Sequence, residues 1–165
     1  MSHTEGVVRQ GADDPLALSE RMLTVLRERA FAALDRAYAP YSAFRVGAAL
    51  LGSDGSVSDG CNVENAAYPA GICAERAALA GAVSRGVRAF EALAIASEAA
   101  EPTPPCGMCR QALAEFAPRL TIVSVTRDGA AARWTLSELL PHAFAADSLA
   151  RGQAAGASAR PELRG

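Results

Sequence analysis

Hydrophobic residues recur at helical spacing between about Leu16 and Tyr38. Neighbouring members of this set lie mostly three or four residues apart, which is typical of a helix with one buried face. They are Leu18, Met22, Val25, Leu26, Ala30, Ala33, Leu34 and Ala37. Asp14 is a candidate N-cap with Pro15 in the first turn, and Pro40 would stop the helix. The pattern predicts a long amphipathic helix at the start of the folded region.

Five short runs of apolar or alternating residues predict β-strands. They are Arg45–Leu51, Ser56–Cys61, Ala92–Ser97, Thr121–Thr126 and Ala131–Thr135. The first two runs flank the turn Ser53-Asp54-Gly55, so they predict a hairpin. Ala92–Ser97 is almost wholly apolar, as a buried central strand would be.

Helical segments alternate with the later strands. Cys73–Arg85 is rich in alanine and closed by Gly86, and Gly107–Phe116 follows a proline-rich loop. Leu136–Pro141 predicts a short helical turn, whereas Asn62–Ile72 predicts an irregular stretch. An opening hairpin followed by alternating strands and helices predicts a three-layer α/β/α sandwich around a five-stranded mixed sheet.

The 165 residues suit one domain. Residues 1–14 are polar and lack a pattern, and residues 151–165 are rich in glycine, alanine, serine and arginine. We therefore expect a disordered leader over 1–14, one domain over 15–150, and a disordered tail over 151–165.

Composition narrows the function classes. All 16 basic residues are arginine, which excludes lysine-dependent chemistry, and the net charge is −2 with the signs interspersed. This balance disfavours binding to nucleic acid through phosphates or to a membrane surface. No apolar run approaches the roughly 20 residues of a membrane span, and the N-terminus lacks the apolar core of a secretory signal. We expect a cytoplasmic protein that binds neither nucleic acid nor membranes.

In a reducing compartment, cysteines serve as metal ligands or reactive thiols more often than as disulfides. The sharpest motif is Pro105-Cys106-Gly107-Met108-Cys109-Arg110, in which two cysteines lie one turn apart at a helix start. The helix N-terminus favours their thiolate forms, so both can reach one ion. Alone, this pair leaves other interpretations open: a redox dithiol, half of a structural zinc site, or two core cysteines.

The segment Cys73-Ala74-Glu75-Arg76 also follows a loop and opens a helix. Cys73 can therefore supply a third thiolate, and three protein ligands that leave one position for water are typical of catalytic zinc. Glu75 suits a proton carrier beside that water, or is an ordinary first-turn glutamate favoured by the helix dipole. Arg76 is a candidate to offset the thiolate charge, whereas Arg110 is as easily a solvated helix residue.

Cys-x-Glu followed by Pro-Cys-x-x-Cys is the zinc deaminase signature in its three-cysteine form. The chain resembles the small homotetrameric zinc-dependent cytidine deaminases over about residues 20–147. Five segments carry the resemblance in family order: Tyr41–Ala49, Gly60–Ala66, Cys73–Arg76, Pro105–Gln111 and Leu139–Phe144. It implies hydrolytic deamination of cytidine and deoxycytidine by a zinc-bound hydroxide, with release of ammonia, in pyrimidine salvage.

The resemblance also implies residue roles. The implied zinc ligands are Cys73, Cys106 and Cys109, with one zinc per subunit and Glu75 as the proton shuttle. The implied substrate contacts are the Phe44 ring with the nucleoside, Asn62 and Glu64 with the ribose hydroxyls, the Ala74 N–H with the base carbonyl, and the Pro104 carbonyl with the departing amino group. The family usually has Ser or Thr at the last of these positions, where only a backbone oxygen is needed. Tyr68 and Phe144 resemble residues of the site between subunits.

Other interpretations stay open on the residues alone. Phe44 would be a core residue, Asn62 and Glu64 turn residues, and Cys61 a small buried residue at a strand end. Neither histidine, His3 or His142, is a probable ligand. A structural zinc module would explain the three cysteines but needs a fourth ligand. A deaminase of a related aminated pyrimidine nucleoside is the nearer alternative.

Overall fold

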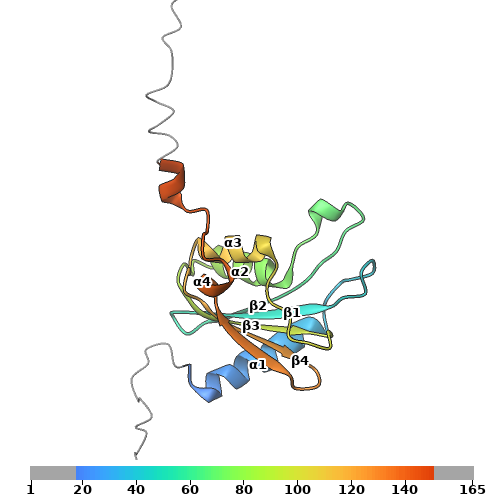
Figure 1. Ribbon diagram of the computed structural model, residues 1–165. Helices are drawn as coiled ribbons and strands as arrows, with labels where there is room; N and C mark the ends of the chain where they lie inside the picture. Colours follow the sequence, from blue (N-terminus) through green and yellow to red (C-terminus); the bar gives the residue numbers. More distant parts are fainter. Residues whose placement is uncertain (1–17, 151–165) are drawn as a thin grey trace, which may run out of the picture.

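A five-stranded mixed sheet crosses the middle of the computed structural model of the protein, which describes residues 18–150 (Figure 1). The strands are β1 (Val46–Gly52), β2 (Val57–Cys61), β3 (Phe90–Ser97), β4 (Thr121–Thr126) and β5 (Ala131–Thr135). Their order is β2-β1-β3-β4-β5, with β3 and β4 parallel and the other neighbours antiparallel. All five predicted strands are confirmed. The predicted leader and tail lie outside the described residues.

Helices cover both faces of this sheet. They are α1 (Glu20–Leu34), α2 (Ala74–Ser84), α3 (Gly107–Ala114), α4 (Leu136–Leu139) and the single 3₁₀ turn η1 (Tyr68–Ala70). Figure 1 shows α1 below the sheet and α2 and α3 above it. One apolar cluster packs α1 against the sheet, and a second packs α2 and α3 against the opposite face. The predicted three-layer sandwich is confirmed.

The first helix is shorter than its hydrophobic pattern suggests. It begins at Glu20, where the Ser19 hydroxyl accepts a hydrogen bond from the Met22 N–H at 3.2 Å. The predicted cap residues, Asp14 and Pro15, lie outside the described residues. Leu18 and Ser19 are not helical, so the predicted start near Leu16 was wrong. A serine that satisfies an otherwise unpaired first-turn N–H is a sufficient start signal.

The same helix also ends before its pattern does. Its last residue is Leu34, and the Tyr38 N–H donates instead to the carbonyl of Asn62 at 3.0 Å. The Glu64 N–H returns a hydrogen bond to the Tyr38 carbonyl at 2.8 Å. The backbone N–H and carbonyl groups of Tyr38 are therefore hydrogen-bonded without a helix, and α1 ends before Pro40.

Two glycines allow the helices to approach the sheet closely. A Cβ at Gly47 of β1 would lie 2.0 Å from the Ala30 carbonyl oxygen of α1. A Cβ at Gly60 of β2 would lie 2.4 Å from the Ala74 carbonyl oxygen of α2. Both separations are far shorter than atoms tolerate, so each position requires glycine. The contact at Gly60 fixes the start of α2, which carries part of the site described below.

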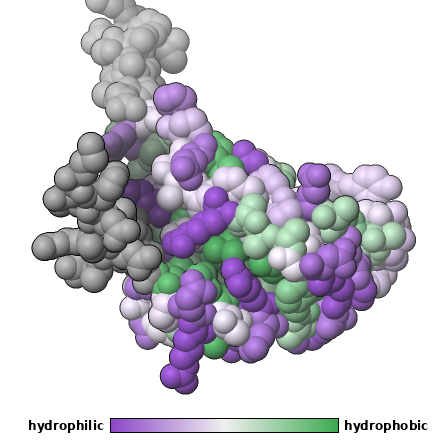
Figure 2. All heavy atoms as spheres, turned by 60° about the horizontal axis from the view of Figure 1, so that its bottom comes forward, coloured by the Kyte–Doolittle hydropathy of each residue, from purple (hydrophilic) through white to green (hydrophobic). Residues whose placement is uncertain are grey.

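Charged side chains of both signs lie around the α1 side of the molecule. Figure 2, in which that side comes forward, shows hydrophilic residues around a centre where hydrophobic residues are visible. Exposed ion pairs join Arg29 to Asp59 at 2.8 Å, and Arg127 to Asp35. Such pairs contribute about 0–1 kcal/mol each. Among residues 18–150, no helix combines the length and apolar character needed to cross a bilayer.

Candidate active site

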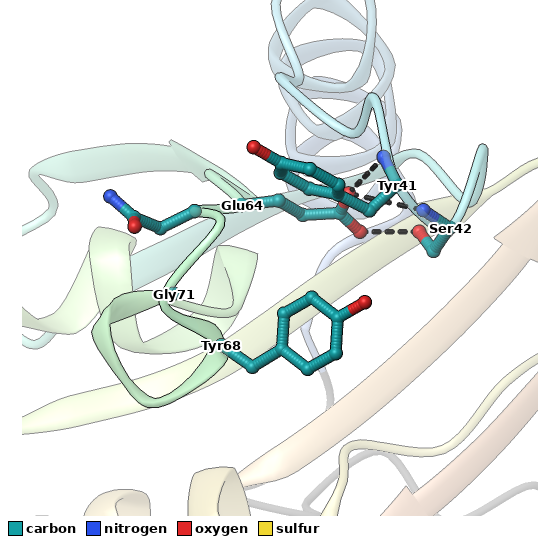
Figure 3. Close-up of a pocket in the computed structure, with 6 residues that line it drawn as sticks. Tyr41, Ser42, Glu64, Tyr68 and Gly71 are labelled. Carbon is teal, nitrogen blue, oxygen red and sulfur yellow. Dashed lines mark hydrogen bonds between the residues drawn. The ribbon is translucent and has the colours of Figure 1, made fainter.

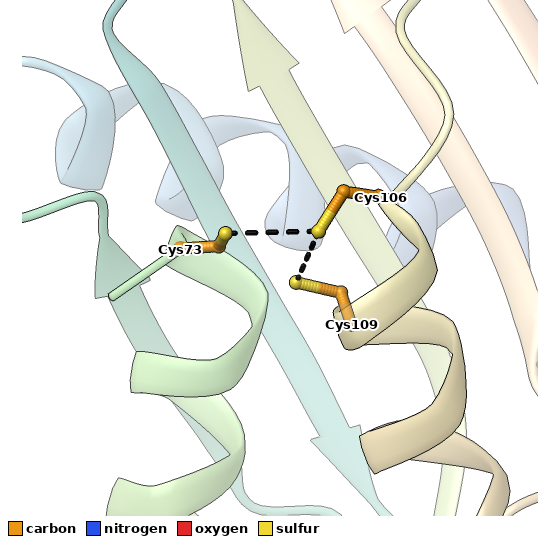
Figure 4. Close-up of side chains that lie close together, drawn as sticks. All are labelled: Cys73, Cys106 and Cys109. Atoms are coloured by element: carbon orange, nitrogen blue, oxygen red, sulfur yellow. Dashed lines mark hydrogen bonds between the residues drawn. The ribbon is translucent and has the colours of Figure 1, made fainter. Parts of the chain in front are cut away.

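Three cysteine side chains converge between the first turns of α2 and α3 (Figure 4). Cys73 is the N-cap residue of α2, Cys106 is the N-cap residue of α3, and Cys109 lies in the first turn of α3. The Sγ atom of Cys106 lies 3.8 Å from that of Cys73 and 3.5 Å from that of Cys109. All three are free thiols. The three predicted ligands are therefore brought together.

The spacing of these sulfurs suits zinc. Zinc binds thiolates at about 2.3 Å in a tetrahedron, and two corners of that tetrahedron lie about 3.8 Å apart. The ligand atoms of Cys73, Cys106 and Cys109 all lie within 4.8 Å of one another, close enough to bind one ion. Three protein ligands leave one tetrahedral position open, as in catalytic zinc sites.

The fourth cysteine is not part of this group. Cys61 ends β2, is half-buried, and donates a hydrogen bond from Sγ to the Arg36 carbonyl at 3.6 Å. The prediction that Cys61 lies at a strand end outside the metal site is confirmed, although its side chain is less buried than expected.

Hydrogen bonds around the sulfurs favour a thiolate at Cys73. The bond from the Cys109 thiol, followed by those from the Arg76 guanidinium and the Cys106 thiol, lowers the pKa of Cys73 to about 5. The same interaction with Cys73, together with burial, raises the pKa of Cys109. Arg76 also donates through Nη2 to the Gly71 carbonyl at 3.4 Å, while its buried Nε has no partner in the described chain. Arg76 therefore lies where it can offset thiolate charge.

Arg110 has a different role from Arg76. Its Nε donates to the Pro105 carbonyl at 2.7 Å and its Nη1 to the Leu139 carbonyl at 2.9 Å. The side chain is half-buried, so the interpretation as a solvated helix residue was wrong. Arg110 links the loop before Cys106 to the end of α4.

The next residue of α3, Gln111, holds the C-terminal segment. Its Nε2 donates to the Phe144 carbonyl at 2.7 Å, and its Oε1 accepts the Phe144 N–H at 3.1 Å. The sequence analysis did not single out Gln111. Its position directly after Cys109-Arg110, in a segment that resembles the family, was the available signal.

A pocket of about 460 Å³ opens beside the cysteines. Its lining contains ten of the predicted site residues: Phe44, Asn62, Glu64, Tyr68, Cys73, Ala74, Glu75, Arg76, Pro104 and Cys106. Thr103 and Met108 also line it, and the sequence analysis did not single them out. Phe144 is not among the lining residues, and 59% of its surface is exposed.

Glu75 is the buried carboxyl of this pocket. It lies in the first turn of α2, and only 5% of its surface is exposed. Burial raises the pKa of Glu75, with a further contribution from the charge of Cys73. A carboxyl whose pKa is raised can hold and release a proton nearer to neutral pH than an exposed one.

Asn62 and Glu64 face the chain segment that contains Phe44. The Asn62 Oδ1 accepts the Val46 N–H at 2.9 Å, and its Nδ2 donates to the Phe44 carbonyl at 2.8 Å. The Glu64 Oε2 accepts the backbone N–H groups of Tyr41 and Ser42 at 2.9 Å and 3.2 Å. These bonds tie Asn62 and Glu64 to the segment before and at the start of β1, and their contact with a sugar stays a prediction.

The Ser42 hydroxyl donates to the other oxygen of Glu64, Oε1 (Figure 3). This bond, followed by the one from the Tyr41 N–H, lowers the pKa of Glu64. Glu64 also lines a second pocket, of about 420 Å³, together with Tyr41, Ser42 and Tyr68. The rings of Tyr41 and Tyr68 are in edge-to-face contact there, with centroids 6.1 Å apart. Glu64 therefore lines both pockets as an ionised acceptor.

Comparison with known proteins bears on this site. Residues 21–125 match the family model described as the cytidine and deoxycytidylate deaminase zinc-binding region. The chain is 48% identical to a cytidine deaminase of Sporosarcina psychrophila over 118 residues, which cover 71% of this chain and 87% of the relative. It is 48% identical to that of Halalkalibacterium halodurans over 126 residues, covering 76% and 96%.

The structural comparison agrees. A crystal structure of cytidine deaminase from Burkholderia pseudomallei matches with a TM-score of 0.71 and 47% sequence identity. The match covers 73% of this chain and 98% of that one. The similarity therefore extends through the whole folded part of that relative.

Proposed function

Because the chain belongs to the zinc-binding family of cytidine and deoxycytidylate deaminases, we propose that it hydrolyses cytidine and deoxycytidine to uridine and deoxyuridine, with release of ammonia. The observation that carries this proposal is the position of the buried Glu75 in the same pocket as Cys73 and Cys106. A structural zinc module would need a fourth protein ligand and would leave this carboxyl without a role.

Cys73, Cys106 and Cys109 hold the zinc. When bound, zinc acts as a Lewis acid that lowers the pKa of a water molecule from 15.7 to about 7. Three thiolates would by themselves weaken this effect through their negative charge. Arg76, which hydrogen-bonds to Cys73, and the N-termini of α2 and α3 offset part of that charge.

Glu75 moves the protons of the reaction. Its carboxylate takes a proton from the attacking water and delivers it to N3 of cytosine, which makes C4 more electrophilic. The hydroxide left by that water adds to C4. Glu75 then carries the proton of the new C4 hydroxyl to the 4-amino group, the C4–N bond breaks, and ammonia leaves. One group that acts first as base and then as acid needs a pKa near the working pH, and burial raises the pKa of Glu75 in that direction.

The remaining pocket residues orient the nucleoside. The Phe44 ring packs against it, and Asn62 and Glu64 bind the ribose hydroxyls. The Ala74 N–H meets the base carbonyl, and the Pro104 carbonyl receives the departing amino group. In support of these roles, all five residues line one pocket with Cys73 and Cys106.

We further propose a homotetramer in which Tyr68 and Phe144 complete the site of a neighbouring subunit. Both side chains are strongly exposed, at 77% and 59%, and so are accessible to a second copy of the chain. Gln111 fixes the backbone of Phe144, so the ring is presented in a defined place. We also propose a cytoplasmic location, because the reducing conditions of the cytoplasm keep the three ligand thiols free. The proposed reaction belongs to pyrimidine salvage.

One assay tests the proposed reaction. Purified protein is analysed for zinc and incubated with cytidine, while the fall in absorbance and the release of ammonia are followed. We expect zinc together with equal amounts of uridine and ammonia. Bound zinc without ammonia release from cytidine would instead support a structural zinc module.

A further inference from the structure

Ser42 connects two residues that line the active-site pocket. Its hydroxyl donates to Oε1 of Glu64 and accepts the backbone N–H of Phe44 at 3.0 Å. Its own backbone N–H donates to Oε2 of Glu64 at 3.2 Å. One short side chain thus touches both the carboxylate assigned to the ribose hydroxyls and the backbone of the residue whose ring is assigned to the nucleoside.

The two carboxylate oxygens of Glu64 are held differently. Oε2 accepts two backbone N–H groups, from Tyr41 and Ser42, whereas the hydrogen bond that the structure shows to Oε1 comes from the Ser42 hydroxyl. Without that hydroxyl, the carboxylate would keep its attachment through Oε2 but could rotate about it. The direction in which Oε1 offers its remaining lone pair to a ligand therefore depends on Ser42.

The backbone beside Ser42 also needs support. Ala43 has a φ of +53°. Among the described residues, no other non-glycine residue has a positive φ. Residues in this left-handed region persist where surrounding bonds hold them. The bonds on either side are the Ala43 N–H to the Ala39 carbonyl, at 3.1 Å, and the Phe44 N–H to the Ser42 hydroxyl. Ser42 thus also fixes the turn that presents Phe44.

We propose that Ser42 is a positioning residue of the deamination reaction, which orients Glu64 toward the sugar hydroxyls of the nucleoside while it holds the Phe44 turn. The inference rests on the proposed function. It predicts that Ser42 contributes more to the use of substrates with 2′- and 3′-hydroxyls than to the use of substrates that lack these two groups.

The experiment compares Ser42→Ala with wild type on cytidine and on 2′,3′-dideoxycytidine, at high enzyme concentration for the slower substrate. Ser56→Ala is the matched control, because the Ser56 hydroxyl also donates to a carboxylate, Oδ1 of Asp54 at 2.6 Å, in the turn between β1 and β2. Zinc content and melting temperature are measured for every variant, so that loss of the fold is recognised.

For Ser42→Ala we expect kcat/KM for cytidine to fall by about tenfold, since a hydrogen bond to a charged group is commonly worth that much. The ratio of kcat/KM for cytidine to that for dideoxycytidine should fall several-fold, with zinc content unchanged. Ser56→Ala should leave both values unchanged. Equal losses on the two substrates, or no loss on either, would overturn the proposal.

The Glu64→Ala variant distinguishes a failure of the inference about Ser42 from a failure of the role proposed for Glu64. If it lowers the substrate ratio and Ser42→Ala does not, the inference about Ser42 fails while the role of Glu64 stands. If wild type deaminates cytidine but Glu64→Ala leaves the ratio unchanged, Glu64 does not bind the 2′- or 3′-hydroxyl and Ser42 cannot act on them through it. A wild type that does not deaminate cytidine would contradict the proposed function itself.

Discussion

The Sγ atoms of Cys73 and Cys106 lie 3.8 Å apart, although 33 residues separate them in the sequence. Each is the N-cap residue of its helix, with an extended backbone, and neither side chain caps a backbone N–H of its own helix. The sulfurs are therefore directed toward each other rather than toward backbone N–H groups. Both lie at the positive end of a helix dipole, which stabilises thiolates there.

Metal content should depend on three of the four cysteines. Cys106→Ala removes one of the three converging sulfurs, so it should abolish both zinc binding and activity. Cys61→Ala is the matched control, since Cys61 bonds to a backbone carbonyl away from the site, and it should keep about one zinc per chain. Metal analysis of the purified variants measures both. Loss of zinc from Cys61→Ala would contradict the site with an open fourth position.

Glu75→Gln should keep its zinc and its fold while losing nearly all turnover. The amide retains the shape of the buried side chain but cannot carry protons. General acid–base catalysis contributes about 10²–10⁴-fold, and here one group serves two transfers, so a loss at or above that range is expected. Steady-state rates at saturating cytidine provide the measurement. A variant within about tenfold of wild type would exclude Glu75 as the proton carrier.

Nucleosides should be preferred over free cytosine and over cytidine 5′-phosphate. Under the proposed roles, Asn62 and Glu64 bind the ribose hydroxyls, and such remote contacts increase the rate as well as the affinity. The ionised Glu64, whose pKa is lowered by the Ser42 hydroxyl and the Tyr41 N–H, disfavours a nearby phosphate. Values of kcat/KM for the three compounds test this preference. Comparable kcat/KM values for cytidine and cytosine would contradict the proposed role of Asn62 and Glu64 in binding the sugar.

Phe144→Ala should weaken the use of cytidine by about ten- to a hundredfold, because stacking of a ring beside a base is worth roughly 1–3 kcal/mol. Zinc content should not change. Leu149→Ala is a suitable control, since Leu149 is another strongly exposed apolar residue, at 54%, and should leave the rate unchanged. Light scattering should show a tetramer for wild type. A fully active monomer would refute the shared site.

Gly60→Ala should destabilise the fold at the start of α2. The added Cβ would meet the Ala74 carbonyl oxygen at 2.4 Å and the Ala78 nitrogen at 2.3 Å, so the helix must move away from β2. Overpacking of this kind costs about 1–3 kcal/mol, which should appear as a lower melting temperature and weaker zinc retention. Gly107→Ala is the control for stability, because a Cβ there meets nothing within 4 Å. An unchanged melting temperature for Gly60→Ala would contradict the close packing of α2.

Local patterns in the sequence were enough to predict most of the elements. The turn at Gly55, with a φ of +81°, joins the predicted hairpin, and Gly86, with a φ of +97°, follows α2. The first helix was predicted poorly at both ends. Its periodicity continues to Ala37, but the Tyr38 backbone pairs with Asn62, and a local pattern carries no information about so distant a partner.

The sequence by itself determined the types of the ligands and their local spacing. Cys106 and Cys109 are one helical turn apart wherever that helix lies, and Glu75 follows Cys73 by two residues on any helix that starts there. These relationships depend only on helix geometry, so they can be read from the chain.

Only the tertiary structure decided which of these groups meet. The Ser42 hydroxyl reaches Glu64 across 22 residues, and Arg110 reaches Leu139 across 29, through contacts that no periodicity encodes. They arise because β1 pairs with β2, which brings the segment before β1 beside the segment after β2, and because α3 lies against α4. Burial on that face, rather than any local motif, also raises the pKa of Glu75 above that of an ordinary first-turn glutamate.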